Sequence, residues 1–255
     1  MYDELNEGLE SLRKKWIKKF KPTYGPPPPE LPPLWAVNHS IPLINPDARY
    51  MQRQPRCPTA LMPLLREKTQ RYLQAGWWKL AHGRNAIPLL SIPKAGAELR
   101  LRTVVDAREC NANTIIDSTP LPNQDLIRDV VASHKYVSVI DMSDAYEQMH
   151  VEPEEVPRTL FSSPFGMFIS NNLQQGDGNG PSSWQRLMTY MFHERIAVQV
   201  WVYIDDIYIF TNTIPNHENA LEYVLKCLID DKLYISPKKL RPYTICFNQA
   251  LWEMV

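Results

Sequence analysis

The sequence predicts an α+β fold, because helical and strand-like segments are mixed along the chain without an internal repeat. Two patterns support this prediction. Apolar residues recur at helical intervals in four segments, residues 59–80, 126–132, 181–193 and 217–231. Short β-rich runs occupy residues 99–105, 136–140 and 198–210, and the last run has the pattern of a hairpin.

The composition is that of an ordinary globular protein. The chain has 255 residues, no net charge, 44% apolar residues and 22% charged residues, which excludes a disordered class and permits a sizeable core. Four scattered cysteines without a CxxC pair argue against a disulfide scaffold or a structural zinc site. The chain has no apolar run long enough for a membrane span and no secretory signal, so we expect an intracellular protein without a membrane partner.

The first 36 residues differ in texture from the rest. The basic stretch LRKKWIKKFK at 12–21 carries apolar residues at helical spacing. It favours a helix that packs this stripe nearby, although contact with phosphates or a membrane surface is an alternative. The Pro-rich residues 25–33 predict a stiff extended spacer. We therefore predict a basic and Pro-rich N-terminal linker over residues 1–36.

The first chemical signal is the run VQVWVYIDDIYIF at 198–210. Two adjacent acids, Asp205 and Asp206, interrupt two β-rich runs, which predicts a hairpin with both acids at its tip. A purely structural tip would favour Asn-Gly or Asp-Gly. Two neighbouring like charges are unfavourable unless a cation offsets them. An ordinary exposed turn is the alternative interpretation.

The second signal is VSVIDMSDAYEQM at 137–149. Asp141 ends a buried strand, and Ser143 or Asp144 can cap a following helical turn, with Glu147 in the position of a capping box. Such a turn would offer backbone N–H groups to a phosphate. By itself, this run also fits a plain strand end and cap.

Together, the two signals predict a shared site. If the two strands are neighbours, the carboxylates of Asp141 and Asp205 converge. Mg²⁺ prefers a few carboxylate oxygens completed by substrate phosphates, and two such ions serve in-line phosphoryl chemistry.

At this point the sequence resembles the reverse transcriptases of gypsy-type LTR retrotransposons. Tyr203 to Asp206 is similar to their YxDD motif, and Asp141 to Tyr146 to their first catalytic motif. Further similarities are QQGDGNGPSSWQ at 174–185, RTVVDARECN at 102–111, Leu121-Pro122, the pair Lys238-Lys239, Val37 to His39 and Ile41 to Leu43. The resemblance covers residues 37–242.

The resemblance implies a right-hand polymerase fold without a thumb. Its palm would combine an antiparallel sheet with helices. The reverse transcriptase domain would span 37–242, with fingers at about 37–113 and 149–178 and a palm at about 114–148 and 179–242. Residues 243–255 would form a diverged or truncated tail, because the expected continuation into a thumb and a ribonuclease H domain is missing.

The resemblance also implies a site. Asp141, Asp205 and Asp206 would be the catalytic acids and would bind two Mg²⁺ ions, with Mn²⁺ as a possible substitute. The incoming dNTP would contact the backbone of Met142, Ser143, Asp144 and Ala145, the side chains of Lys94, Arg102 and Gln175, and Tyr146 as a gate against the 2′-OH.

The implied activity is RNA-directed and DNA-directed DNA synthesis on an RNA or DNA template with a primer. The sequence leaves the oligomeric state open. Two alternatives stand beside this activity: an inactive retroelement remnant that at most binds nucleic acid, and a viral-type RNA polymerase palm, against which Tyr146 argues.

Overall fold

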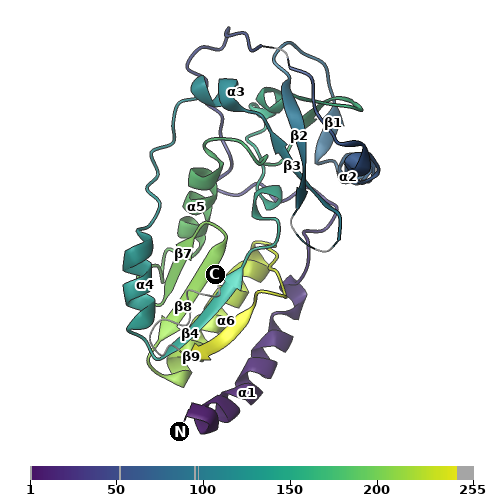
Figure 1. Cartoon of the computed structure of the whole chain (residues 1–255). Helices are drawn as coiled ribbons and strands as arrows, with labels where there is room; N and C mark the ends of the chain where they lie inside the picture. The colour runs from purple at the N-terminus through teal and green to yellow at the C-terminus, as the bar shows by residue number, and fades with distance from the viewer. Residues whose placement is uncertain (1, 52, 95, 97, 246–255) are drawn as a thin grey trace. The chain divides into compact units, whose positions relative to one another are not determined.

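The structure is a computed structural model that describes residues 2–51, 53–94, 96 and 98–245. The chain forms two compact units, each assembled from separate stretches (Figure 1). Unit 1 comprises Met1–Pro27, Pro120–Ala145 and Gln185–Val255, and unit 2 comprises Pro28–Thr119 and Tyr146–Trp184. Of the tail predicted at 243–255, residues 243–245 belong to the strand Arg241–Ile245, and residues 246–255 lie outside the described residues.

Unit 1 is built around a four-stranded antiparallel sheet. The strand order is β7 (Val200–Tyr203), β8 (Asp206–Thr211), β4 (Tyr136–Asp141) and β9 (Arg241–Ile245). The first five residues of β4 are all buried, because this inner strand is covered on both faces. The predicted α+β fold is confirmed.

Two helices cover the opposite faces of this sheet (Figure 1). Helix α4 (Gln124–Ala132) packs Ile127 and Val131 against Val137 and Val139 of β4. Helix α6 (Ile214–Asp230) reaches Ser138, which points to the other face because successive strand residues alternate. The Asn123 side chain caps α4 by accepting from two backbone amides.

Helix α1 (Tyr2–Lys19) belongs to unit 1, although the sequence analysis placed it in a linker. Trp16 and Phe20 are fully buried, as the apolar stripe predicts. Arg13 donates to the backbone oxygen of Tyr243 in β9 at 2.8 Å. Lys15 and Lys19 form ion pairs with Glu218 and Glu222, one turn apart on α6. Arg13, Lys15 and Lys19 thus contribute to the docking of this helix.

Unit 2 contains a five-stranded sheet with the order β1, β6, β5, β2, β3. The strands are β1 (Trp78–Leu80), β2 (Ile87–Lys94), β3 (Arg100–Val105), β5 (Phe161–Ser163) and β6 (Gly166–Ser170). Its helices are α2 (Met62–Gln74), α3 (Arg108–Ala112) and the start of α5 (Gly180–Met191). Aromatic rings of Tyr72, Trp78, Phe161 and Phe168 pack together in the core.

Short 3₁₀ turns complete the chain at Lys21–Thr23 (η1), Thr59–Leu61 (η2), Ala145–Gln148 (η3) and Val156–Thr159 (η4). The helix predicted for 59–80 ends at Gln74, because Gly76 adopts a left-handed conformation with φ of 74°. Among the described helices, none has the length and apolar character to cross a membrane.

A buried histidine ties α6 to the sheet of unit 1. The Tyr243 amide donates to the Ser138 hydroxyl, which lies 2.7 Å from His217 Nε2. On the other side of the ring, Nδ1 lies 3.0 Å from the Thr211 hydroxyl, which donates to the Thr213 carbonyl. One neutral tautomer, protonated at Nδ1, satisfies the whole chain of hydrogen bonds. Burial lowers the pKa of His217 from 6.5 to about 4.

His217 is therefore expected to contribute less to the stability of unit 1 in mild acid. The unfolded chain binds a proton at His217 near pH 6.5, and the folded chain does so only near pH 4. The contribution of His217 to the free energy of unfolding, measured as the difference between wild type and His217→Gln, should fall through this window by about 3 kcal/mol. Urea denaturation across the pH series checks this, with the exposed His193→Gln as a matched control. An equally steep acid slope in His217→Gln would contradict the assignment.

Candidate active site

The strand register of unit 1 brings the predicted acids together. Asp141, the last residue of β4, lies directly opposite Asp206, the first residue of β8. Asp205 precedes Asp206 in the turn from β7, and its carbonyl accepts from the Met142 amide at 2.9 Å. The turn residues are Ile204 and Asp205, so the predicted tip of Asp205-Asp206 is shifted by one residue. The expected convergence of Asp141 with Asp205 follows from this pairing.

The hairpin turn is strained and is held from one side by a glutamine. Ile204 has a φ of 51°, a conformation that costs a β-branched residue about 1–3 kcal/mol. The buried side chain of Gln185 on α5 accepts from the Ile204 amide at 2.9 Å and donates to the Val202 carbonyl at 3.1 Å. Gln185 therefore fixes the backbone immediately before Asp205.

Replacing Gln185 by Leu should loosen this turn. The change removes two hydrogen bonds to buried backbone groups, and we expect a loss of about 2 kcal/mol in the free energy of unfolding. Hydrogen exchange at the Ile204 amide should accelerate. The variant Gln185→Glu keeps the acceptor for Ile204 and serves as the control. An unchanged exchange rate at the Ile204 amide in Gln185→Leu would show that the turn keeps its conformation without the Gln185 hydrogen bonds.

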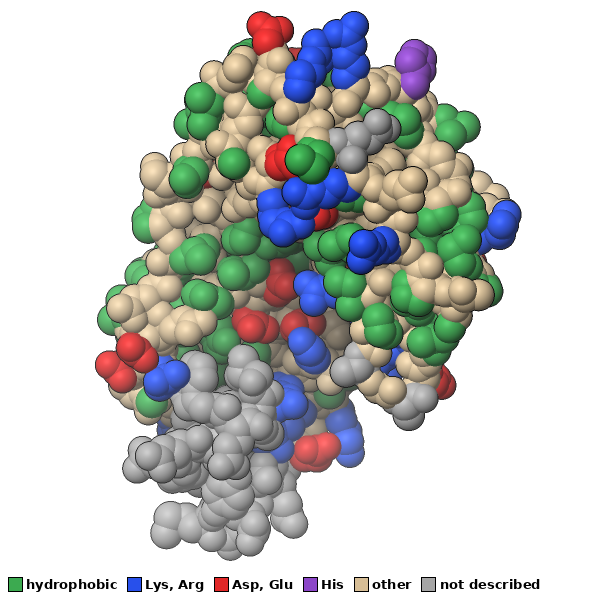
Figure 2. All heavy atoms as spheres, turned by 45° about the horizontal axis from the view of Figure 1, so that its top comes forward, with side chains coloured by type: hydrophobic (Ala, Val, Ile, Leu, Met, Phe, Trp, Pro, Cys, Tyr) green, Lys and Arg blue, Asp and Glu red, His purple; other side chains and the backbone are tan. Residues whose placement is uncertain are grey.

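The carboxylates form a repulsive cluster. Burial and the nearby charges of Asp141 and Asp206 raise the pKa of Asp205 to about 6. Burial and Asp141 also raise the pKa of Asp206. Figure 2 shows acidic side chains grouped on the face that it draws, with Lys or Arg side chains beside them.

One lysine partly offsets these negative charges. The ammonium of Lys239 donates to Asp141 Oδ2 at 2.6 Å. This hydrogen bond raises the pKa of Lys239, so its positive charge is secured. The pair Lys238-Lys239 is noticeable in the sequence, but the contact with Asp141 is visible only in the fold.

The chemistry of the donor set fits a hard divalent cation. Asp205 Oδ1 is buried and has no hydrogen-bond partner, which is costly for a carboxylate oxygen unless a cation approaches it. In the described part of the chain, no three His, Cys, Asp or Glu side chains already surround a metal position. The site thus offers an open set of oxygens that other ligands would have to complete.

The backbone after Asp141 is less available than predicted. The Met142 amide donates to Asp205, and the Ser143 amide donates to the Tyr234 carbonyl at 3.0 Å. These two amides are therefore not open N–H groups for a phosphate. Glu147, expected in a capping box, instead accepts from Lys68 and from the hydroxyl of Tyr72, both on α2.

Unit 2 presents a basic face on the hairpin of β2 and β3. Lys94 pairs with Arg100, and Ile92 pairs with Arg102, so the three cations project to the same side. All three are exposed. Like charges directly opposite each other are unfavourable by themselves, and an anion would relieve their repulsion.

The Gly-rich segment, residues 174–180, lies against β3 and α3. The Arg102 Nε donates to Gln175 Oε1 at 2.8 Å, and the Val105 amide donates to the Gln175 carbonyl at 2.8 Å. Asn111 donates to the Gly176 carbonyl and accepts from the Gly178 amide. Arg102 and Gln175, which were each predicted to contact the dNTP, thus contact each other, and the segment has a fixed shape.

Tyr146 belongs to unit 2 and lies next to the end of this segment. A Cβ atom built on Gly180 would come within 3.3 Å of Tyr146 Cε2. Tyr146 is half-buried, and Gly180 leaves room for its ring.

Comparison with known proteins identifies the family. Residues 92–247 match the family described as "Reverse transcriptase (RNA-dependent DNA polymerase)". Because the match covers more than half of the chain, the chain belongs to this family. The predicted resemblance is thereby confirmed.

Curated relatives include Pol polyproteins of Drosophila melanogaster transposons. The chain is 25% identical to that of transposon opus over 236 residues, which covers 91% of the chain and 23% of the relative. It is 31% identical to that of transposon gypsy over 140 residues, which covers 55% of the chain and 14% of the relative. The chain therefore spans less than a quarter of the length of these relatives.

Solved structures share the fold. A foamy viral protease-reverse transcriptase in complex with double-stranded DNA matches with a TM-score of 0.78 and 22% identity, over 91% of this chain and 40% of that one. The same kind of protein in complex with an RNA/DNA hybrid matches with a TM-score of 0.77 and 22% identity, over 89% of this chain and 30% of that one.

Proposed function

We propose that the chain performs RNA-directed and DNA-directed DNA synthesis, with unit 2 as the fingers and unit 1 as the palm. The observation that carries this proposal is the register that places Asp141 opposite Asp206 and beside Asp205. Three clustered carboxylates at the ends of these strands do not stabilise the sheet, whereas nucleotidyl transfer needs them. Membership of the reverse transcriptase family supports the same activity.

Asp141, Asp205 and Asp206 would hold two Mg²⁺ ions in this proposal. The ions, when bound, would lower the charge barrier to attack of a primer 3′-OH on the α-phosphate of a dNTP. Lys239 balances Asp141 electrostatically. Gln185 orients Asp205 by holding the Ile204 turn. Most of the rate would come from this positioning and charge stabilisation.

The fingers would supply the nucleotide contacts. We assign the triphosphate to Lys94 and Arg102, because the amides of Met142 and Ser143 already donate within unit 1. The contacts left to Asp144 and Ala145 in this segment would be secondary. Gln175, oriented by Arg102, would line the sugar side, and Tyr146 would exclude the 2′-OH. Template sequence would be read by base pairing, so the protein needs chiefly backbone contacts.

Primer extension tests the proposal. The chain is incubated with an RNA template, a DNA primer, dNTPs and Mg²⁺, and Asp205→Asn is run in parallel. We expect the wild-type chain to extend the primer and Asp205→Asn not to extend it. A folded wild-type chain that binds primer–template without extending it would favour the inactive-remnant alternative.

Sugar selectivity tests the role of Tyr146. Replacement by Val removes the ring that would meet a 2′-OH, so incorporation of ribonucleotides relative to dNTPs should rise by about tenfold or more. Competition between one dNTP and its ribonucleotide in the extension assay measures this ratio. An unchanged ratio would remove Tyr146 from the sugar site.

A further inference from the structure

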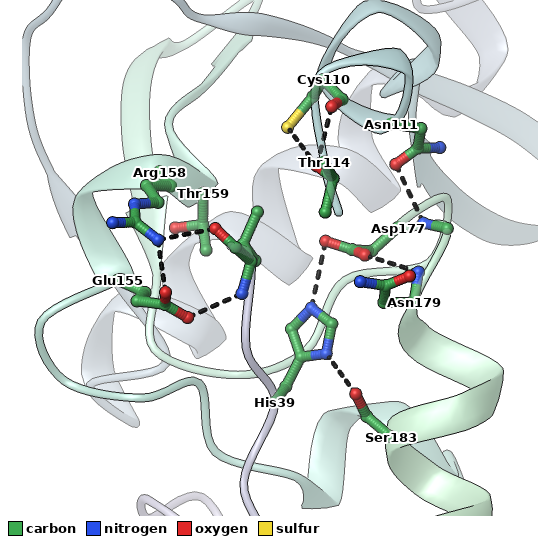
Figure 3. A network of polar contacts seen from close by, with 12 residues as sticks. His39, Cys110, Asn111, Thr114, Glu155, Arg158, Thr159, Asp177, Asn179 and Ser183 are labelled. Atoms are coloured by element: carbon green, nitrogen blue, oxygen red, sulfur yellow. Dashed lines mark hydrogen bonds and ion pairs between the residues drawn. The ribbon is translucent and has the colours of Figure 1, made fainter. Parts of the chain in front are cut away.

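A buried histidine in unit 2 connects the Gly-rich segment with helix α5. His39 is almost completely buried, and its two ring nitrogens have different partners (Figure 3). Nδ1 lies 3.0 Å from the Ser183 hydroxyl on α5, at hydrogen-bond distance. Nε2 lies 3.1 Å from Asp177 Oδ2 in the Gly-rich segment, which is an ion-pair contact without the alignment of a hydrogen bond. The backbone of His39 is fixed separately, because its amide donates to His150 and its carbonyl accepts from Glu152.

The chemistry of the partners fixes the direction of each contact. A carboxylate only accepts, so the contact at 3.1 Å is favourable when Nε2 carries a proton. In the neutral ring, Nδ1 then accepts from the Ser183 hydroxyl. The second oxygen of Asp177 accepts from the Asn179 amide at 3.1 Å. His39 thus contacts both the start of α5 and the loop before it.

The order Ser183, His39, Asp177 is that of a nucleophile, a base and an acid. A nucleophile has to reach a substrate, however, and the side chains of Ser183 and His39 are each about 1% exposed. Because they are buried, these residues fit a positioning role and not acyl transfer.

We propose that His39 is a positioning residue for the nucleotide pocket, an inference that rests on the function proposed above. The contact of Nε2 with Asp177 holds the Gly-rich segment from the side opposite to Asn111 and Arg102. Two residues before Asp177, the segment carries Gln175. Through this path His39 fixes where Gln175 presents its side chain to a dNTP, although His39 itself is shielded from solvent.

Two conservative variants separate this role from a general contribution to packing. In His39→Gln the amide nitrogen can occupy the place of Nε2, which keeps the Asp177 contact and loses the Ser183 contact. In His39→Asn the amide occupies the place of Nδ1, with the reverse outcome. Each variant loses one of the two polar contacts of the ring, so a merely structural role would affect both equally.

Hydrogen exchange and steady-state kinetics are measured on the full chain. We expect faster exchange at residues 174–180 in His39→Asn and Asp177→Ala, and near wild-type exchange in His39→Gln and Ser183→Ala. The KM for dNTP should rise about tenfold in His39→Asn, the size expected for one lost contact with a charged group, while the KM for primer–template stays constant. Thermal unfolding confirms that the variants are folded.

The outcomes separate this inference from the proposed function. Equal exchange at 174–180 in His39→Asn and His39→Gln would overturn the positioning role. Faster exchange with an unchanged dNTP KM would overturn the link to the nucleotide pocket. If the wild-type chain synthesises no DNA, the proposed function fails, and the exchange comparison still decides whether His39 positions the segment.

Discussion

Replacing Asp205 by Asn should abolish primer extension, with a loss on the order of 10³-fold or more in rate. The amide keeps the shape of the side chain but removes the negative charge that would hold a divalent cation. Asp205 Oδ1 has no hydrogen-bond partner, so the substitution removes no hydrogen bond of the fold at that oxygen. Single-turnover extension at saturating dNTP measures the effect.

The same variant should be more stable than the wild-type chain when no metal is present. The pKa of Asp205 is raised from 3.8 to about 6, so the folded chain disfavours the carboxylate that the unfolded chain accepts. This penalty is complete above about pH 6 and vanishes below pH 3.8. At pH 7.5 its removal should add about 2 kcal/mol to the free energy of unfolding.

The exposed Asp129 on α4 provides the matched control. Asp129→Asn should leave both extension and stability unchanged. If Asp205→Asn extended primers at the wild-type rate, the catalytic assignment of the hairpin would be wrong. A lower free energy of unfolding of Asp205→Asn without metal would contradict the inferred repulsion among the acids.

Replacing Gly176 by Ala should disrupt the Gly-rich segment. Gly176 has a φ of 112°, and an added Cβ would lie far inside the 3.0 Å limit that real Cβ atoms keep from other atoms, here the Val105 carbonyl oxygen. That oxygen belongs to strand backbone and has little freedom to move. We expect a loss of about 3 kcal/mol or more in the free energy of unfolding of unit 2, together with loss of dNTP binding.

Gly76→Ala distinguishes backbone strain from collision. Gly76 also has positive φ, at 74°, but the nearest atom to an added Cβ, in the side chain of Leu31, lies 3.9 Å away. We expect a cost of about 1 kcal/mol there, from conformation alone. Denaturant unfolding of both variants gives the comparison. Equal costs would mean that the Val105 backbone yields, and that the segment is not rigid.

Local patterns in the sequence predicted much of unit 1. Apolar, β-rich runs at 136–140 and 198–210 indicated strands, and the doubled acids marked the hairpin. The helical stripe at 12–21 predicted that Trp16 would be packed, as it is. These features depend on residues that are close in the sequence, so periodicity and residue type are enough to predict them.

Contacts between distant residues could not be predicted in this way. Lys239 meets Asp141 across 98 positions, and His39 meets Ser183 across 144. A lone buried histidine and a basic pair have many possible partners until the topology selects one. Ile204 was equally hidden, because nothing in its residue type suggests a left-handed conformation.

The docking of α1 on β9 has a consequence for synthesis of the chain. Arg13 and its acceptor Tyr243 are 230 positions apart. At roughly 5–20 residues per second, α1 leaves the ribosome roughly 10–50 s before its partner strand exists. During this interval Trp16 and Phe20 lack their final cover and need a chaperone or a temporary neighbour. The last segment of unit 2 ends at Trp184, so all residues of unit 2 are synthesised about 60 positions before Tyr243.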